Sequence, residues 1–193
     1  MQKAIPLFLD TEFTGLHQQS SLISIALVLD NQTYFYAELT DYDTGQISDW
    51  IQKNVIDNLL FAEKEEFISI SGGKVRIKGT RQQLQRGLEE WFSQLPNVEI
   101  WADVLAYDWV LFCSIFGDAF QIPKNIFYIP FDMATALKIK GINPDTSRQK
   151  IAFKDQHSQN ECLSNYDVKN LSQHNALFDA IVLKEVYLKL KII

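Results

Sequence analysis

Cysteine is scarce in this chain, and long apolar runs are missing. Only two of the 193 residues are cysteine, Cys113 and Cys162, and they lie far apart without CxxC spacing. This argues against a disulfide framework or a zinc site and favours a reducing, cytoplasmic setting. The first apolar run, residues 4–9, is too short for a secretory signal or a membrane span. We therefore expect neither an export signal nor a membrane partner.

Positive charge is also in deficit, because the formal net charge is −6. This argues against a nucleic-acid partner, since Lys and Arg usually supply most of the affinity for phosphates. Two stretches, residues 67–88 and 138–154, are nevertheless basic. Their basic residues are Lys74, Arg76, Lys78, Arg81 and Arg86 in the first stretch, and Lys138, Lys140, Arg148, Lys150 and Lys154 in the second. Solvated faces of helices and loops, or a local basic surface, would each explain them.

What the chain does have is a globular composition, with 47% hydrophobic and 22% charged residues. Its length suits one domain with one well-filled core. Internal repeats and linker-like segments are absent from the sequence. We therefore expect a single soluble domain across residues 1–193.

The first half of the chain predicts strands followed by helices. Residues 5–9, 21–29 and 32–39 are apolar runs separated by turn residues, which indicates an antiparallel meander. Apolar residues at helical spacing predict a helix over residues 47–60, and alternation predicts a ribbon over residues 67–77 that turns at Gly72-Gly73. Thr80 and Gln83 have the spacing of a capping box, so a helix follows that Pro96 ends.

The second half alternates strands with helices. We expect strands at 98–102 and 126–129, helices at 107–116, 131–139 and 175–190, and a largely looped region at 141–170. Such an order predicts an α/β fold, with a mixed central sheet that begins as an antiparallel meander and is flanked by helices.

Two carboxylates follow the first predicted strand. Asp10 and Glu12 stand two residues apart in "DTEFTG", directly after residues 5–9. Side chains of an extended segment alternate between faces, so these two carboxylates can reach one site. Oxygen ligands of this kind suit hard cations such as Mg²⁺ or Mn²⁺. An acidic surface turn is the competing interpretation, because such pairs arise by chance in a chain with 24 acidic residues.

A histidine and an aspartate mark the start of the last predicted helix, in "HNALFDA". The helix fixes the backbone of Asp179, whereas His174, before the first turn, keeps freedom to swing toward a substrate. Imidazole titrates near neutral pH and can take a proton from water, so the pair suits a general base beside a metal ligand. Helix capping by His174 is the competing interpretation.

A further carboxylate lies near the middle of the chain. Asp108, in "AYDWVLF", opens the predicted helix 107–116, and Asp103 ends the strand before it. Only one of them is needed as a ligand. Stabilisation of a helix N-terminus would also explain an acid at position 108.

Taken in order, these segments resemble the motifs of the DEDDh exonucleases of the RNase T and DnaQ-like superfamily. "DTEFTG" is similar to the first motif, "AYDWVLF" to the second and "HNALFDA" to the third, so the resemblance covers most of the chain. The aspartate of the second motif follows an aromatic residue and opens a helix, which fits Asp108 better than Asp103. The resemblance implies an RNase H-like fold and one 3′-5′ exonuclease domain. The implied ligands of two Mg²⁺ or Mn²⁺ ions are Asp10, Glu12, Asp108 and Asp179.

Within the superfamily, the chain is more similar to small bacterial exoribonucleases of the RNase AS type, through "LISIALV" and "WADVLAYD". Other members have Asn where this chain has Val104, and many have Glu in place of Ser24. These departures agree with the RNase AS type. That subgroup implies a homodimer that acts on the 3′ ends of single-stranded RNA and prefers adenylate-containing RNA.

The resemblance also implies a mechanism. His174 accepts a proton from the attacking water in a two-metal hydrolysis that releases nucleoside 5′-monophosphates. Thr14 and the adjacent backbone at Gly15 contact the terminal sugar, while Phe13 and Leu16 pack against the last bases. Core packing is the competing interpretation for Phe13 and Leu16.

Two alternatives stay open. The same fold could serve a 3′-5′ DNA exonuclease or an oligoribonuclease, because contacts to the 2′-hydroxyl, which motifs do not locate, distinguish RNA from DNA. A non-catalytic RNA-binding protein is the alternative from another class. The complete set of motif residues favours an enzyme.

Overall fold

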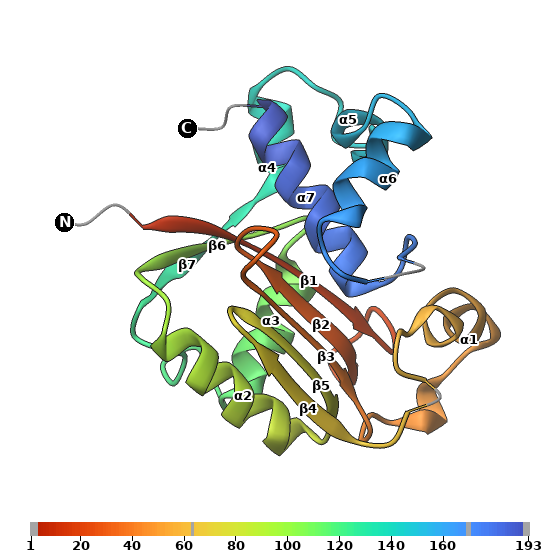
Figure 1. Cartoon of the computed structure of the whole chain (residues 1–193), viewed down its shortest axis with the longest axis vertical. Coiled ribbons are helices and arrows are strands. Elements are labelled where there is room, and N and C mark those ends of the chain that lie inside the picture. The colour runs from red at the N-terminus through yellow and green to blue at the C-terminus, as the bar shows by residue number, and fades with distance from the viewer. Residues whose placement is uncertain (1–3, 63, 169–170, 191–193) are drawn as a thin grey trace.

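A mixed β-sheet forms the centre of the molecule. The computed structural model describes residues 4–62, 64–168 and 171–190. Within these residues, seven strands join in the order β4-β5-β3-β2-β1-β6-β7 (Figure 1). They are β1 (Ile5–Phe13), β2 (Leu22–Val28), β3 (Tyr34–Leu39), β4 (Phe67–Ser71), β5 (Lys74–Gly79), β6 (Val98–Ala102) and β7 (Ile126–Asp132). The expected α/β class with a mixed central sheet is confirmed.

The sheet begins with the predicted antiparallel meander. β1 pairs with β2, and β2 with β3, in antiparallel register, whereas β6 lies parallel to β1 and β7 parallel to β6. The carboxyl ends of β1, β6 and β7 therefore lie along the same edge of the sheet. Residues near the end of β1 and just after β6 are brought together at this edge.

The first strand is longer than the sequence predicted. β1 continues beyond Leu9 to Phe13, so Asp10 and Glu12 lie within the strand and not after it. Pairing with β2 explains the extension, because the register continues from Phe8 to Phe13. Both carboxylates consequently project from a backbone that the sheet holds in place.

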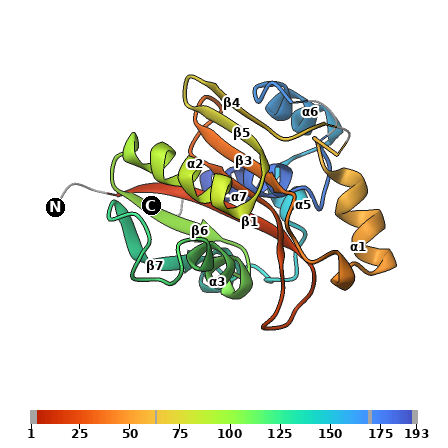
Figure 2. The ribbon, with the colours of Figure 1, turned by 90° about the horizontal axis from the view of Figure 1, so that it is seen from below.

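Helices cover both faces of the sheet. The helices of the described residues are α1 (Asp49–Asn54), α2 (Arg81–Ser93), α3 (Ala106–Ile115), α4 (Met133–Ile139), α5 (Arg148–Ala152), α6 (Gln156–Ser164) and α7 (Ala176–Leu190). Figure 2 shows α2 and α3 in front of the sheet and α7 behind it. In β1, Leu7 and Leu9 pack in the cluster that includes α2 and α3, and Phe8 packs with α7. Strands covered on both faces read as continuous apolar runs, which is why their positions were predictable.

The helix predicted over residues 47–60 is wrong in its extent. α1 ends at Asn54, and a separate 3₁₀ turn, Ile56–Asn58, follows it. Side-chain amides compete with the helical backbone here, since Asn58 Nδ2 donates to the carbonyl of Asn54 at 2.6 Å. Apolar spacing alone cannot reveal this competition.

The region predicted as largely loop, residues 141–170, contains two short helices, α5 and α6. A capping box begins α6, because Asp155 Oδ1 accepts from the backbone N–H of Ser158 at 2.8 Å. Packing then stabilises the helix, since Cys162 and Leu163 pack against core clusters that include residues of α7. Residues 169–170 lie outside the described residues.

Other local predictions are confirmed. The capping box of Thr80 and Gln83 begins α2, with Thr80 Oγ1 accepting from the N–H of Gln83 at 3.4 Å. β4 and β5 form an antiparallel ribbon, and Gly72 in its turn has a φ of 59°, which favours glycine. Cys113 is buried as predicted, and neither Cys113 nor Cys162 is in a disulfide. Among the described residues, we find no helix with the length and apolar character that crossing a membrane requires.

Three residues of the first basic stretch serve the fold. Lys74 pairs with Asp167, and Arg76 donates to the hydroxyl of Tyr34. Lys78 Nζ donates to three backbone carbonyls, those of Phe61 at 2.7 Å, Ala62 at 2.9 Å and Lys64 at 2.7 Å. These three cations hold loops against the sheet, whereas Arg86 of the same stretch is exposed.

Candidate active site

Asp10 and Glu12 project from β1 toward α7. Alternation along the strand places them on the same face as Phe8, which packs against α7. Glu12 pairs in register with Ser24 of β2, and the register shifts immediately afterwards at Phe13. The prediction that the two carboxylates share one side of the strand is confirmed.

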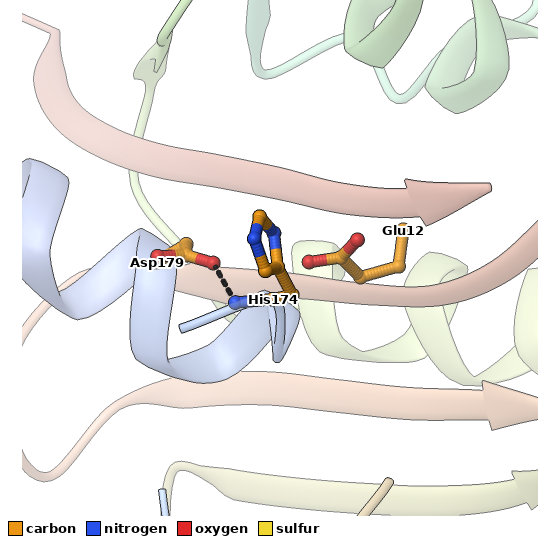
Figure 3. A group of neighbouring side chains, drawn as sticks. All are labelled: Glu12, His174 and Asp179. Carbon is orange, nitrogen blue, oxygen red and sulfur yellow. Dashed lines mark hydrogen bonds between the residues drawn. The ribbon is translucent and has the colours of Figure 1, made fainter. Parts of the chain in front are cut away.

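His174 and Asp179 meet these carboxylates from the start of α7. Figure 3 shows the His174 imidazole between the carboxylates of Glu12 and Asp179. One possible ligand atom from each of these three residues lies within 4.8 Å of the other two. Segments far apart in the sequence therefore converge on one small volume.

The backbone at His174 has a left-handed conformation. Its φ is 63°, and its N–H donates to Asp179 Oδ2 at 2.8 Å. The capping interpretation does not hold for the imidazole, because the Asn175 side chain accepts the N–H of Leu177 at 3.1 Å. The histidine ring is left facing the carboxylates.

Asp108 joins the same site from α3. Only 8% of Asp108 is exposed, and its Oδ1 accepts from Thr11 N at 3.0 Å and from Thr11 Oγ1 at 2.6 Å. Thr11 lies between Asp10 and Glu12 on β1, so it fixes Asp108 beside them. Asp103 has another partner, because it pairs with Arg148 Nη2 at 2.8 Å.

Two hollows open on the site. The first, which we call the apolar lobe, has a volume of about 540 Å³ and includes Phe13, Leu16, Trp50, Ile51 and Val55. The second, the polar lobe, has a volume of about 320 Å³ and includes Asp103, Ser147, Arg148, Gln149 and Gln173. Asp10, His174 and Asp179 line both lobes. The acidic cluster therefore lies at the junction of an apolar and a polar hollow.

Burial, reinforced by neighbouring carboxylates, raises the pKa values of the carboxyl groups. Burial, followed by repulsion from Asp179 and Asp108, raises the pKa of Glu12 to about 8. Burial is also the main cause that raises the pKa of Asp179 to about 7 and that of Asp108 to about 6. For Asp10, burial and then the charges of its acidic neighbours raise the pKa well above its usual range. The folded protein therefore disfavours the simultaneous ionisation of these four carboxyl groups.

This set of side chains fits divalent cations. The candidate ligands are mostly carboxylate oxygens, which Mg²⁺ and Mn²⁺ prefer. Buried carboxylates that repel one another gain most from a bound cation, because its positive charge favours their ionised form against both burial and mutual repulsion. One oxygen of Asp108 is held by Thr11, which leaves the other for an ion.

The predicted substrate-binding residues of the apolar lobe differ in how far their side chains are exposed. Leu16 is 75% exposed, whereas Phe13 packs partly against the core and stacks on Tyr107 with ring centroids 5.6 Å apart. Thr14 is buried, and its Oγ1 accepts from Ser21 N at 2.8 Å and bonds to Gln46. The Thr14 hydroxyl thus maintains the loop, and Leu16 and the backbone at Gly15 are the groups best placed to meet a ligand.

Trp50 lines the candidate site, although the pattern of the sequence did not indicate this. It is 56% exposed, lines the apolar lobe and lies edge-on to the His174 ring with centroids 5.1 Å apart. Its apolar spacing with Ile51 and Val55 predicted a core position on a helix. A large aromatic residue beside a histidine could have been recognised only from the fold, since 124 positions separate them in the sequence.

Comparisons with known proteins agree with this geometry. A family model described as "3′-5′ exoribonuclease Rv2179c-like domain" matches residues 6–190. Two similar proteins from Mycobacterium tuberculosis are 3′-5′ exoribonuclease MT2234.1 of strain CDC 1551 / Oshkosh and 3′-5′ exoribonuclease Rv2179c of strain ATCC 25618 / H37Rv. Each is 29% identical over 121 residues, which cover 62% of this chain and 66% of the relative, just under two thirds of its length.

Proposed function

Because this chain belongs to the 3′-5′ exoribonuclease Rv2179c-like domain family, we propose that it is a metal-dependent 3′-5′ exoribonuclease. It would shorten single-stranded RNA from the 3′ end and release nucleoside 5′-monophosphates. The observation that carries the proposal is the meeting of Glu12, Asp179 and His174 within 4.8 Å, beside Asp10 and Asp108. The chain as a single exonuclease domain and its assembly as a homodimer belong to the same proposal.

The carboxylates would hold the cofactor. Asp10, Glu12, Asp108 and Asp179 would hold two Mg²⁺ or Mn²⁺ ions. When bound, these ions stabilise the charge that develops on the attacking and departing oxygens of a phosphodiester. Because β1 carries two of the ligands and Thr11 fixes a third, the protein supplies a preformed acidic site.

His174 is the proton acceptor. Its imidazole faces the acidic site from a fixed loop, and burial lowers its pKa below the usual value. A neutral imidazole can accept the proton of the attacking water. The Trp50 ring lies edge-on to the imidazole.

The apolar lobe suits the terminal nucleoside. Leu16, Trp50 and Val55 offer apolar and aromatic surface on which a base can stack. The backbone at Gly15 lies at the same lobe and would contact the terminal sugar. A preference for adenylate over uridylate or cytidylate is proposed for this lobe, because a purine base covers more apolar surface than a pyrimidine does.

Cleavage of end-labelled oligomers tests the proposed function. Poly(A), poly(U) and DNA oligomers labelled at the 5′ end are incubated with Mn²⁺, Mg²⁺ or EDTA. We expect a ladder that shortens from the 3′ end only with metal, faster on RNA than on DNA and fastest on poly(A). Binding without any ladder would indicate an RNA-binding protein, and equal rates on both homopolymers would remove the adenylate preference.

His174→Ala is expected to lower kcat by about a hundredfold to ten-thousandfold, the usual range for a general base. In the wild type, activity rises with pH as the imidazole loses its proton, and this rise lies at lower pH than for an ordinary histidine, since the pKa is lowered. The pH–rate profile of the variant should lack this rise. An unchanged profile in His174→Ala would contradict the assignment, and His157→Ala, on α6, is the matched control.

A further inference from the structure

The polar lobe has no role yet in the proposed function. It opens on Asp10, His174 and Asp179, as the apolar lobe does, and so lies directly beside the reacting groups. A strand whose last nucleoside occupies the apolar lobe, and whose scissile phosphate lies at the carboxylates, must continue past them. The polar lobe is a hollow that borders the same residues and can receive that continuation.

The wall of the polar lobe carries free hydrogen-bonding side chains. Ser147 begins α5 without a side-chain capping bond, and Gln149 follows it on the same helix. Within the described part of the chain, no hydrogen bond occupies the side chains of Ser147, Gln149 or Gln173, although all three line the lobe. A hydroxyl and two amides are therefore available to donate to a ligand.

The charged residues of this wall neutralise one another. Arg148 pairs with Asp103 at 2.8 Å, and its Nη1 donates to the carbonyls of Pro144 at 2.6 Å and Thr146 at 2.7 Å. Asp103 thus adds little net repulsion toward an anion in the lobe. The guanidinium is held by three acceptors, so it supports the wall on which Ser147 and Gln149 stand.

We propose that the polar lobe is a subsite for the phosphodiester one linkage upstream of the scissile bond, with Ser147, Gln149 and Gln173 as its hydrogen-bond donors. The subsite rests on the proposed function, because it assumes a strand threaded through the acidic site. Neutral donors suit this place, since they bind a phosphate without competing with the cations for the carboxylates. The contact reads the backbone and is independent of base sequence.

A charge change at Gln149 tests the subsite. Gln149→Glu is nearly isosteric and places a negative charge beside the proposed phosphate, so KM for a five-nucleotide RNA should rise by about three- to tenfold. With a neutral methylphosphonate at the linkage upstream of the scissile bond, the increase should fall below about twofold. Gln149→Lys should lower KM on the ordinary RNA and lose this advantage on the methylphosphonate RNA.

Gln121→Glu is the matched control. Gln121 precedes β7 in the sequence, at the sheet edge opposite the carboxyl ends of the parallel strands, and it is exposed. The KM of the Gln121→Glu variant should equal that of the wild type on both RNAs.

A Gln149→Glu penalty that persists on the methylphosphonate RNA, or no penalty at all in a folded variant, overturns the subsite. If Gln149→Glu does not fold, the Gln149→Lys variant is the test. A KM of Gln149→Lys that is not lowered on the ordinary RNA, or that stays lowered on the methylphosphonate RNA, overturns the subsite. A wild type that cuts neither RNA refutes the proposed function instead, so the two failures are distinguishable.

Discussion

Asp108→Asn is expected to slow the shortening of 5′-labelled RNA by about a thousandfold or more, and Asp103→Asn by no more than about tenfold. Both aspartates lie near the acidic site, but their surroundings differ. Asp108 is buried, and one of its oxygens is left free when Thr11 takes the other. Asp103 is already neutralised by Arg148. Single-turnover rates at saturating Mn²⁺ measure the difference.

Asp10→Ala is the reference for this comparison, because Asp10 lines both lobes. This variant should lose as much activity as Asp108→Asn does. Asparagine keeps the shape of the side chain in two of the variants, and alanine at position 10 removes a charge from a crowded acidic site, so circular dichroism should show that all three variants fold. A larger loss of activity in Asp103→Asn than in Asp108→Asn would show that Asp103, and not Asp108, is the metal ligand. Metal affinity measured by calorimetry should separate the two aspartates in the same order.

The metal-free protein should lose stability as pH rises, by about 2 kcal/mol or more between pH 5 and pH 9. The pKa values of Asp108, Asp179 and Glu12 in the folded state are about 6, 7 and 8, above those of free carboxyl groups. The folded state then holds protons that the unfolded chain has already lost. The resulting stabilisation is complete below about pH 4, where the unfolded chain is also protonated, and it disappears as pH passes through the raised values.

Thermal melting with EDTA and with Mg²⁺ measures this effect. Bound cations should remove most of the pH dependence, because they replace the protons and stabilise the folded state by mass action. In EDTA at pH 8, Asp10→Asn should melt about 5 °C above the wild type, although it is inactive. A metal-free wild type that is most stable at pH 9 would show that the pKa values of these carboxyl groups are not raised in the folded state.

The sequence predicted the centre of the sheet because strands such as β2 and β3 are buried on both faces. Runs such as β2 are buried at every position, and such runs stand out without knowledge of their partners. Where local competition decides, the prediction was wrong, as at Asn54, where α1 ends and its carbonyl accepts from the Asn58 side chain, and at Asp155, which begins α6 inside a predicted loop. These outcomes depend on side-chain bonds that hydrophobic periodicity does not record.

The site residues that lie in short sequence motifs were predictable. Asp10, Glu12, His174 and Asp179 carry their own spacing, and the structure brings them together as expected. Trp50 could not be found in this way, because its position beside His174 arises from the packing of α1 against the loop before α7.

The left-handed backbone of His174 bears on how such a protein would change over generations if its reaction were no longer needed. A non-glycine residue in this conformation costs about 1 kcal/mol, and the cost is tolerated only while the imidazole is useful. Without selection for catalysis, glycine or asparagine at this position would relieve the strain and stabilise the loop. Descendants that have abandoned the reaction should therefore be recognisable by glycine or asparagine in place of this histidine.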